Sequence, residues 1–473
     1  MDIREGLTFD DVLLIPRKSA VYSRKDVDTT ARLTPRISLH IPLVAANMDT
    51  VTEGKMARAL AQMGGIGIIH RFLSIERQAE EVRRVKRAEN VVIDDPVTIT
   101  PDETLGKVRR IIHQEEISGI PVVRERRGKK RLVGIITARD LLFETDDRKK
   151  VSEVMTKDVV TASSDVSLET ARELLHLHRI EKLPLVDKDG MLMGLITLGD
   201  ILKRITNPYA AKDKKGRLLV GAAIGIKEDV LPRTEALLAE GADVIVVDVA
   251  HGHNERAIAT VRLLKKTFGP LIEVIAGNIA TAQAAEDLIK AGADGLKVGI
   301  GPGAACTTRI VTGVGVPQLT AIMDVAKVTR RRDVPMIADG GVRNSGSFSK
   351  ALAAGAHTVM IGNLLAGCDE SPGEYITDRG VAYKYYRGMA SHEATAEKRR
   401  LDGTEASAPT PEGASGRVAY RGEARMVVDD LVGGLRSSMS YLGARDLDQF
   451  AKNAQFIRMS RAGFEESGPH GVK

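Results

Sequence analysis

The sequence contains no tryptophan and few other aromatic residues, with 8 phenylalanines and 8 tyrosines among 473 residues. A binding surface for single-stranded nucleic acid needs aromatic side chains for base stacking, so that function is not expected. The chain also lacks a strong charge excess, because 69 Lys and Arg residues face 63 Asp and Glu residues, a net charge of +6. Without a long basic block, this small excess favours an anionic small molecule over nucleic acid as the partner.

Cysteine is scarce as well. Cys306 and Cys368 are the only two, which excludes a disulfide framework and a four-cysteine zinc site. The first residues, MDIREGLTFDD, contain no apolar signal core, and no apolar run approaches the roughly 18 residues of a membrane span. We therefore expect a cytoplasmic protein in a reducing compartment, and the length predicts two or three domains.

Short apolar segments alternate with amphipathic segments through most of the chain. Buried strands are expected at residues 41–47, 65–70, 219–223, 244–249, 272–276, 296–300, 335–338 and 358–361. Helices are expected at residues 55–63, 76–89, 232–240, 256–266, 282–291, 321–330 and 345–354. Fully apolar strands are typical of parallel sheets that are covered on both faces. The βα order predicts an α/β fold, a (β/α)8 TIM barrel, with an open doubly wound sheet as the alternative.

Residues 92–204 interrupt this pattern with an internal repeat. PVTITPDETL (96–105) matches VVTASSDVSL (159–168), GIPVV (119–123) matches KLPLV (182–186), and LVGIITARDLL (132–142) matches LMGLITLGDIL (192–202). Each copy predicts the order strand, helix, strand, strand, helix, and a basic hairpin at residues 124–131 lengthens the first copy. The predicted organisation is a barrel made from residues 1–91 and 205–473, with a separate repeat domain over residues 92–204.

The segment KVGIGPGAACTTR (297–309) is a glycine-rich turn that presents a cysteine. Its glycines permit positive φ angles and allow backbone amides and carbonyls to line a small concave site. Taken alone, the segment fits a buried cysteine in a tight turn as well as an exposed nucleophile.

The predicted barrel decides between these two interpretations, since TIM-barrel active sites lie at the carboxyl ends of the strands. Polar residues follow six of the predicted strands: Asn47, Met48 and Asp49; Asp248, His251 and His253; Gly277 and Asn278; Cys306; Asp339, Gly340 and Gly341; Gly362 and Asn363. We therefore predict that Cys306 is catalytic. Asp339-Gly-Gly and Gly362-Asn are typical of a ribose carboxylate and of backbone amides around a phosphate, with two ordinary turns as the alternative.

Two further patterns are rejected as sites. Gly299-x-Gly301-x-x-Ala304 matches a dinucleotide fingerprint superficially, but Cys306-Thr-Thr is not expected to open a helix, and no acidic residue stands about 20 positions further on. His251-x-His253 lacks an evident third zinc ligand.

Residues 383–422 do not continue the alternation of strands and helices, and residues 392–416 show no apolar periodicity. We predict a long loop there that closes over the site as a flap.

Taken together, these segments resemble the IMP dehydrogenase / GMP reductase family over essentially all 473 residues. The resemblance rests on MDTVTE, GGIGIIHR, AHGH, VGIGPG..CTTR, ADGGVR, YRGM, PEG and VGGLRS. The repeat domain resembles a tandem pair of CBS motifs, a Bateman module. In such modules a Thr-x-x-Asp turn, here Thr137/Asp140 and Thr197/Asp200, faces the ribose of an adenine or guanine nucleotide, and a purely structural repeat is the alternative.

The resemblance implies that Cys306 attacks C2 of a purine nucleotide while a hydride moves between C2 and a nicotinamide. It implies catalytic roles for Thr308, Arg400 and Glu412 as well. The implied substrate-binding residues are Asp339, Gly340, Gly341, Gly362, Asn363, Tyr386, Gly388, Met389 and Glu412. The implied cofactor residues are Asp248, Asn278 and Gly299. A K+ ion would be held by Gly301, Gly303 and Cys306, with Glu466, Ser467 and Gly468 supplied by a neighbouring subunit of a homotetramer.

The family runs the chemistry in two directions. The dehydrogenase converts IMP, NAD+ and water to XMP and NADH in guanine nucleotide synthesis, and the reductase converts GMP and NADPH to IMP and ammonia. The dehydrogenase activates water with an Arg-Tyr pair in its flap, but here Leu401 follows Arg400. Residues 45–48 (AANM) and 248–250 (DVA) also favour the reductase, and Ala304 replaces a usual serine that contacts phosphate. TVTE, PEGASGRV and FIRMSRAG favour the dehydrogenase, which is our leading interpretation. A non-catalytic nucleotide sensor is the third interpretation.

Overall fold

The computed structural model describes residues 3–88, 93, 95–115, 117–126, 128–199, 201, 206–403 and 410–469. The chain divides into two compact units. One unit contains Met1–Ala88 and Tyr209–Lys473, and the other contains Glu89–Pro208. Each unit is described separately below.

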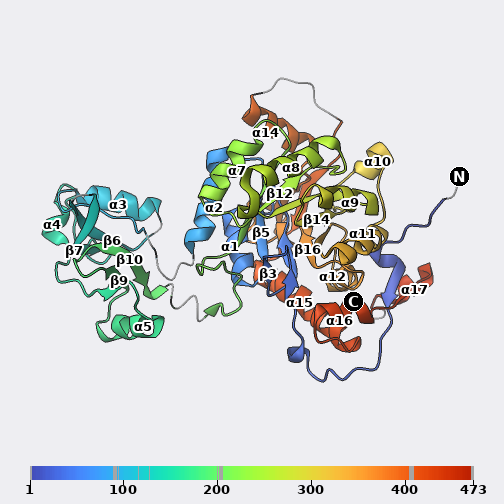
Figure 1. Ribbon diagram of the computed structural model, residues 1–473, viewed down its shortest axis with the longest axis horizontal. Coiled ribbons are helices and arrows are strands. Elements are labelled where there is room, and N and C mark those ends of the chain that lie inside the picture. Colours follow the sequence, from blue (N-terminus) through green and yellow to red (C-terminus); the bar gives the residue numbers. More distant parts are fainter. Residues whose placement is uncertain are drawn as a thin grey trace. The chain divides into compact units, whose positions relative to one another are not determined.

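The first unit is built on a closed barrel of eight parallel strands, surrounded by helices (Figure 1). Its strands, in barrel order, are β11 (Val220–Ile224), β12 (Val244–Asp248), β13 (Val274–Ile279), β14 (Gly295–Val298), β15 (Met336–Asp339), β16 (Thr358–Ile361), β4 (Leu43–Ala45) and β5 (Ile66–Ile69). Every strand overlaps a strand predicted from an apolar run. The predicted (β/α)8 barrel is confirmed, and the open doubly wound sheet is wrong.

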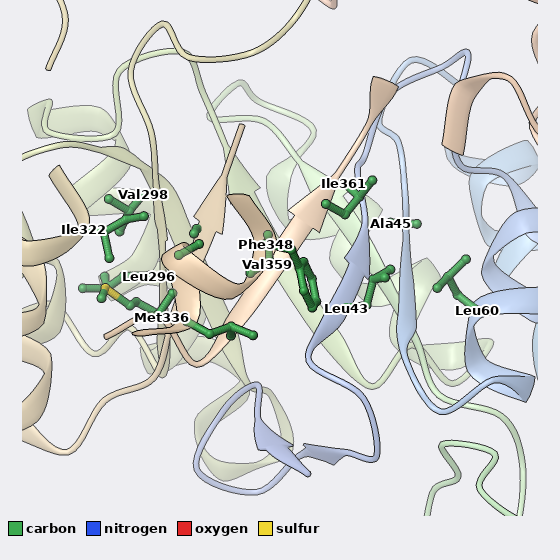
Figure 2. Packing of buried hydrophobic residues seen from close by; sticks show 14 of the residues in the cluster. Leu43, Ala45, Leu60, Leu296, Val298, Ile322, Met336, Phe348, Val359 and Ile361 are labelled. Atoms are coloured by element: carbon green, nitrogen blue, oxygen red, sulfur yellow. The ribbon is translucent and has the colours of Figure 1, made fainter. Parts of the chain in front are cut away.

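The strands separate two apolar cores, because successive side chains of a strand point to opposite faces. In β12, Val244 and Val246 belong to the core inside the barrel, whereas Ile245 and Val247 belong to the core between the strands and the helices. The outward-facing residues Leu296, Val298, Met336, Val359 and Ile361 pack around Ile322 and Phe348 of the helical layer (Figure 2). A strand buried on both faces reads as a continuous apolar run, which is why these strands could be predicted.

The helices that cover the barrel are also as predicted, to within a few residues. They are α1 (Gly54–Gln62), α2 (Ile75–Ala88), α7 (Val230–Ala239), α8 (Glu255–Phe268), α9 (Ala282–Lys290), α11 (Gln318–Arg332) and α12 (Ser345–Ala353). Asn254, Thr281 and Asn344 cap α8, α9 and α12 by accepting a hydrogen bond from a backbone amide of the first turn. In the described part of the chain, no helix is long and apolar enough to cross a membrane.

The C-terminal region is largely helical. The segment GGLRS (433–437) predicts the start of a final helix, but α15 begins earlier and runs from Ala424 to Tyr441. Gly433 and Gly434 lie inside this helix, where Gly434 lets α15 approach α12: a Cβ at Gly434 would lie 2.3 Å from the Cβ of Ser345. α16 (Leu447–Asn453), β20 (Phe456–Arg458) and α17 (Arg461–Glu466) follow, and β20 pairs with the N-terminal strand β1 (Val12–Leu14).

The predicted flap is not a simple loop. β17 (Tyr375–Asp378), β18 (Val381–Arg387) and β19 (Ser415–Ala419) form an antiparallel sheet, and α14 (His392–Asp402) lies between β18 and β19. The expectation of irregular structure across residues 392–402 is wrong. Ser391 caps α14, good helix formers such as Ala, Glu, Lys and Arg fill it, and Gly403 ends it with a left-handed conformation. A largely solvated helix needs no apolar stripe, so periodicity alone missed it.

The second unit contains the two sequence repeats, each with an apolar core of its own. The first copy contains α3 (Leu105–Gln114), β6 (Gly119–Arg126) and β7 (Lys129–Thr137), and the basic segment forms the predicted β6–β7 hairpin. The second contains β8 (Ala162–Ser163), α5 (Leu168–Leu177), β9 (Lys182–Val186) and β10 (Leu192–Thr197), and the short α4 (Val151–Val154) lies between the copies.

One predicted helix of the repeat domain is replaced by turns. Residues 138–143 form consecutive turns, because Asp140 accepts hydrogen bonds from both the backbone amide and the hydroxyl of Thr137, each at 2.7 Å. This is the Thr-x-x-Asp turn of the first copy. In the second copy Thr197 ends β10, and Asp200 lies outside the described residues.

Candidate active site

Cys306 lies in the loop that joins β14 to α10 (Thr308–Thr312), at the carboxyl end of the barrel strands. Its backbone amide donates to the carbonyl of Gly303 at 3.0 Å, which closes the loop into a tight turn. Its side chain is partly exposed, whereas Cys368 is fully buried and burial raises the pKa of that thiol to about 12. The expectation that Cys306-Thr-Thr opens no helix is wrong, although α10 has only 5 residues.

Cys306, Thr308 and Glu412 form a chain of hydrogen bonds. The thiol Sγ donates to Thr308 Oγ1 at 3.2 Å, and that hydroxyl donates to Glu412 Oε2 at 2.9 Å. The backbone amide of Thr307 donates to the carbonyl of Glu412 at 2.9 Å, which fixes the two segments to each other. A nucleophile, a hydroxyl and a carboxylate in series can pass a proton away from the reacting sulfur or from a nearby water.

The flap is joined to the Cys306 loop through its backbone. The amide of Ala414 donates to the carbonyl of Ala305 at 2.8 Å, and the amide of Gly388 donates to the carbonyl of Ala414 at 2.9 Å. A Cβ at Gly388 would lie 2.9 Å from the Ala305 oxygen, and a Cβ at Gly413 would lie 2.8 Å from the Ser391 nitrogen. Glycine is required at both positions because two chain segments approach closely there.

Strand alternation places three charged side chains inside the barrel at this end. Leu296 and Val298 face the helices, so Lys297 between them points inward, and the same parity turns Asp248 and Asp339 inward from β12 and β15. Lys297 Nζ lies 2.9 Å from Asp248 Oδ1 and 2.8 Å from Asp339 Oδ2.

Asn278 joins the same cluster from β13. Its Oδ1 accepts from Lys297, and its Nδ2 donates to Asp339 Oδ2 at 2.9 Å and to the Gly299 carbonyl at 2.8 Å. The Lys297 cluster, which is Lys297 with Asp248, Asn278 and Asp339, therefore brings the expected cofactor residues against the expected ribose residue.

The charges of this cluster stabilise one another. Burial alone would lower the pKa of Lys297, but the carboxylates of Asp248 and Asp339 outweigh it and raise that pKa. Burial alone would raise the pKa of Asp248, but Lys297, Arg71 and a hydrogen bond from Asn47 hold it below its ordinary value. Both side chains are therefore ionised at neutral pH.

The loops after β14 and β15 are packed so closely that only glycine fits. Gly299 adopts φ +153°, and a Cβ there would lie 2.1 Å from the carbonyl oxygen of Asp339. Gly340 and Gly341 have φ angles of +93° and +81°, and a Cβ at Gly340 would lie 3.0 Å from the amide nitrogen of Gly303. Side-chain-free backbone of this kind leaves amide groups open to a phosphate or ribose.

Gly362 and Asn363 follow β16 and open the short helix α13 (Asn363–Ala366). The hydroxyl of Tyr386 lies near Gly362, 3.6 Å from where a Cβ would stand, and it approaches Met48 Sδ at 3.9 Å. Burial, with the nearby charges of Asp339 and Cys306, raises the pKa of Tyr386, so the phenol stays protonated and can donate a hydrogen bond.

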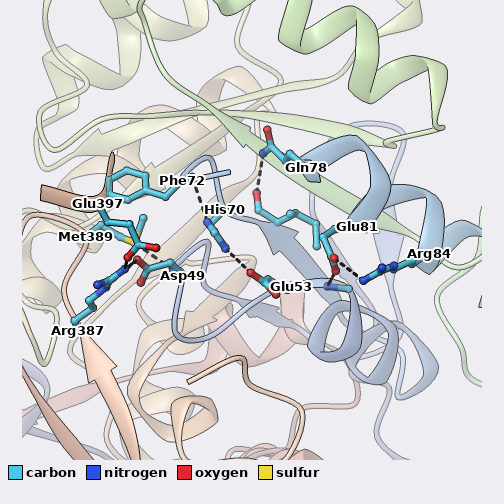
Figure 3. Close-up of polar contacts among 12 residues, drawn as sticks. Asp49, Glu53, His70, Phe72, Gln78, Glu81, Arg84, Arg387, Met389 and Glu397 are labelled. Atoms are coloured by element: carbon cyan, nitrogen blue, oxygen red, sulfur yellow. Dashed lines mark hydrogen bonds and ion pairs between the residues drawn. The ribbon is translucent and has the colours of Figure 1, made fainter. Parts of the chain in front are cut away.

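Figure 3 shows how the flap is fixed to the barrel. Arg387 donates two hydrogen bonds to Asp49 Oδ2, at 2.9 and 2.6 Å, and also pairs with Glu397 of α14. The Sδ atom of Met389 accepts from the amide of Asp49 at 3.3 Å. Arg400 lies exposed in the last turn of α14, and the described hydrogen bonds do not join it to Cys306, Thr308 or Glu412.

Some predicted residues have other partners. His253 pairs with Asp287 at 3.0 Å and so contacts the adjacent helix α9. Glu466, Ser467 and Gly468 lie in and just after α17, which Figure 1 shows well apart from α10. The described residues contain no group of three His, Cys, Asp or Glu side chains that could hold a metal ion. A cation at the Cys306 loop would therefore be held by peptide oxygens.

Sequence reasoning missed three functional candidates: Lys297, Arg71 and Arg387. Lys297 could have been found, since a lysine inside a buried apolar strand needs a charged partner. Arg71 follows β5, whose carboxyl end contributed no predicted site residue.

Three buried polar atoms at this end of the barrel, Asp49 Oδ1, Arg71 Nε and Gln318 Oε1, have no hydrogen-bond partner in the described chain. Such atoms are rare in folded proteins, and a polar ligand would satisfy them.

Comparison with known proteins agrees with this geometry. A model of the IMP dehydrogenase / GMP reductase domain matches residues 6–470. Inosine-5'-monophosphate dehydrogenase of Nitrosopumilus maritimus is 53% identical over 478 residues, covering 100% of this chain and 99% of that protein. The Bacillus subtilis protein of the same name is 51% identical over 473 residues, covering 99% of this chain and 96% of that protein.

Among solved structures, a cysteine-to-alanine variant of GMP reductase from Trypanosoma brucei, in complex with guanosine 5'-monophosphate, superposes with a TM-score of 0.94. It is 46% identical, and the match covers 100% of this chain and 99% of that chain. The same reductase in complex with guanosine 5'-triphosphate gives a TM-score of 0.82 at 43% identity, over 97% of this chain and 98% of that chain. This chain is therefore an oxidoreductase that belongs to the IMP dehydrogenase / GMP reductase family.

Proposed function

We propose that this protein is an IMP dehydrogenase that converts IMP, NAD+ and water to XMP, NADH and a proton. The hydrogen-bonded series Cys306–Thr308–Glu412 at the carboxyl end of the barrel supports covalent chemistry at Cys306, and the named relatives support the direction of the reaction. Relatives named inosine-5'-monophosphate dehydrogenase, at 51 and 53% identity over nearly the whole chain, support this direction.

In this mechanism Cys306 Sγ, as the thiolate, forms a bond to C2 of the purine. Asp248, Asn278 and Gly299 would hold NAD+ beside the nucleotide, and its nicotinamide would supply the acceptor for the hydride that leaves C2. The nucleotide is then covalently attached to Cys306, oxidised by two electrons. Water adds to C2, the C–S bond breaks, and XMP leaves with the water oxygen. Thiolate suits both steps because it is a strong nucleophile and a good leaving group.

The water must lose a proton, and Thr308 with Glu412 is the proton path that the geometry favours. Glu412 accepts the hydrogen bond of the Thr308 hydroxyl at 2.9 Å, so Thr308 can accept a proton from water as it gives its own to Glu412. Arg400 is the alternative base, although it lies in α14 without a described contact to Cys306 and Leu401 follows it in place of a tyrosine. Movement of α14 would be needed to bring Arg400 to the substrate.

The remaining predicted residues would bind the two ligands. Asp339 would accept hydrogen bonds from the ribose hydroxyls, while Gly340, Gly341, Gly362, Asn363 and Tyr386 would surround the phosphate. Gly388 and Met389 would lie by the base, together with Glu412. Asp248, Asn278 and Gly299 would face the nicotinamide riboside. The Lys297 cluster supports this assignment, because Lys297 orients the carboxylates of Asp248 and Asp339 by pairing with both.

The Cys306 loop also fits a monovalent cation such as K+. Peptide oxygens suit a hard cation, and positive φ angles at Gly299 and Gly301 shape this loop. The carbonyls of Gly301, Gly303 and Cys306 would hold the ion, and it would stabilise the loop that carries the nucleophile. Glu466, Ser467 and Gly468 would come from a neighbouring subunit, as α17 lies apart from α10 within one chain (Figure 1). This arrangement would require an oligomer, and the resemblance to the family favours a homotetramer.

The repeat domain would bind an adenine or guanine nucleotide at its Thr-x-x-Asp turns. In the first copy, Asp140 Oδ2 already holds the turn by accepting two hydrogen bonds from Thr137. Such a nucleotide would be a regulator rather than a substrate, because the catalytic residues all lie in the barrel unit.

GMP reductase is the second candidate, and Leu401 favours it because the tyrosine used for water activation is absent. The solved relatives named GMP reductase support the same alternative. Both directions share the Cys306–Thr308–Glu412 series, so the site geometry alone does not separate them.

A direct assay distinguishes the two directions. The purified protein is incubated with IMP and NAD+, and separately with GMP and NADPH, while nicotinamide absorbance is followed. We expect NADH formation in the first mixture and a flat signal in the second. NADPH consumption that depends on GMP, without NADH formation from IMP, would overturn the dehydrogenase assignment in favour of the reductase.

A further inference from the structure

Arg71 stands at the carboxyl end of β5, where its guanidinium forms one long ion pair and no described hydrogen bond. Its side chain is 24% exposed, and its Nε is buried without a hydrogen-bond partner. In the described part of the chain no hydrogen bond of this side chain is found, and Asp248 Oδ2, at 4.0 Å, is its nearest recorded carboxylate. Of the five N–H donors of this guanidinium, the one at Nε is buried without an acceptor, a costly arrangement unless a ligand satisfies it.

The surroundings hold this guanidinium in place and leave space beside it. Its central carbon lies 5.2 Å from the centroid of the Phe72 ring, a cation–π contact. On the side of β11, Gly225 presents no side chain, and a Cβ there would lie 3.5 Å from Arg71 Nη1. The strands β5, β11, β12, β13 and β14 follow one another around the barrel. Arg71 follows β5, Asp248 lies on β12 and Lys297 lies on β14, so Arg71 and Lys297 approach Asp248 from opposite sides.

Charge selects the kind of ligand. Lys297 is shared between Asp248 and Asp339, and Arg71 brings a second positive charge to the edge of the proposed cofactor site, at 4.0 Å from Asp248 and with its Nε donor unused. The planar fork of arginine matches phosphate oxygens, and charge-assisted hydrogen bonds to phosphate are among the strongest in proteins. We infer that Arg71 binds the diphosphate of the dinucleotide cofactor, an assignment that rests on the proposed function.

Binding of the reduced cofactor tests this without relying on turnover. In a Cys306→Ala background with saturating IMP, NADH and NADPH are titrated separately by their fluorescence. Arg71→Met is expected to weaken both by the same factor, roughly ten- to a hundredfold, the cost of a lost charge-assisted contact. Arg71→Lys should recover part of the loss, because it keeps the charge but not the fork. Arg77→Met is the matched control, since Arg77 is exposed in the first turn of α2.

Steady-state kinetics of the otherwise unmodified protein add a second measurement. Arg71→Met should raise KM for NAD+ by a similar factor while KM for IMP changes by less than about twofold. Its melting temperature should match that of the parent, because Arg71 makes no hydrogen bond within the described chain.

Four outcomes would overturn the assignment. If Arg71→Met binds NADH as the parent does, Arg71 does not contact the cofactor, and the proposed function stands. If only NADPH binding falls, Arg71 contacts the extra phosphate of that cofactor; if IMP binding falls instead, it contacts the nucleotide. If the Cys306→Ala parent binds neither NADH with IMP nor NADPH with GMP, the proposed function fails together with this assignment.

Discussion

Two groups of polar residues meet at the same end of the barrel, and they are built in opposite ways. The Lys297 cluster comes from neighbouring strands, is centred on a buried lysine, and pairs that lysine with two carboxylates of the same barrel. The series Cys306–Thr308–Glu412 is partly exposed and joins residues as far as 104 positions apart, one of them in the flap. The first group is fixed by the fold, whereas the second exists only while the flap lies on the Cys306 loop.

Under the proposed function, this contrast would match two tasks. Carboxylates that bind ribose hydroxyls would have to be oriented in advance, because reorganising them during catalysis would cost rate. The reacting sulfur, by contrast, would have to accept a nucleotide, admit a nicotinamide and then a water. A proton path that the flap completes would allow that exchange. We therefore expect mutations of the two groups to affect stability and turnover in different proportions.

The largest effect is expected from Lys297→Met. The substitution leaves Asp248 and Asp339 buried without their cation, which typically costs about 3–5 kcal/mol of unfolding free energy. The melting temperature of the barrel unit should fall by several degrees and activity should be lost with it. Lys290→Met, on the exposed surface of α9, is the matched control and should leave both unchanged. If the two variants melt at the same temperature, the Lys297 cluster does not hold the barrel end together.

Thr308→Val should have little effect on stability and a large effect on turnover. It removes the hydroxyl between Cys306 and Glu412, and loss of a general-base path typically costs on the order of 10²-fold in rate. Rapid-mixing measurements should still show a first burst of NADH, since the hydride step precedes water attack, followed by slow steady-state turnover.

The control for this variant is Thr312→Val. Thr312 lies in the same short helix and donates to the Thr308 carbonyl at 2.7 Å, but its hydroxyl does not touch Cys306. It should keep nearly normal kcat. Loss of the NADH burst in Thr308→Val would show that Thr308 acts in the attack of the thiolate, and an unchanged steady-state rate would remove it from the proton path.

The same contrast explains what could be predicted from sequence. The barrel strands, the helices and the position of Cys306 follow from apolar periodicity, because burial on one or both faces leaves a direct trace in the residue pattern. The alternation of side chains along the strand would also have placed Lys297 inside the barrel, because a lysine between Leu296 and Val298 faces away from both.

The flap was predictable only in part. Helix α14 is largely solvated, so its sequence carries no apolar stripe, and propensity with the Ser391 cap was the only local signal. The pairing of Arg387 with Asp49 and the hydrogen bond from Thr308 to Glu412 depend on how distant segments fold together. Local sequence contains no record of such a contact, so the resemblance to a family supplied Glu412 and nothing supplied Arg387.

The smallest of the three effects is expected from Gly388→Ala, which acts on the flap junction alone. The added methyl group would lie 2.9 Å from the Ala305 carbonyl oxygen, closer than a Cβ normally approaches, so the flap must move away from the Cys306 loop. We expect kcat to fall by roughly tenfold, the loss expected when catalytic groups are slightly misplaced, with little change in melting temperature.

Gly416→Ala in β19 is the matched control, because a Cβ there meets nothing within 4 Å. Because both substitutions add one methyl group to the flap sheet or its junction, equal kcat values in the two variants would mean that close contact between flap and loop does not limit turnover. A large loss of stability in Gly388→Ala alone would instead place the flap among the fixed parts of the fold, and the distinction between the two polar groups would then fail.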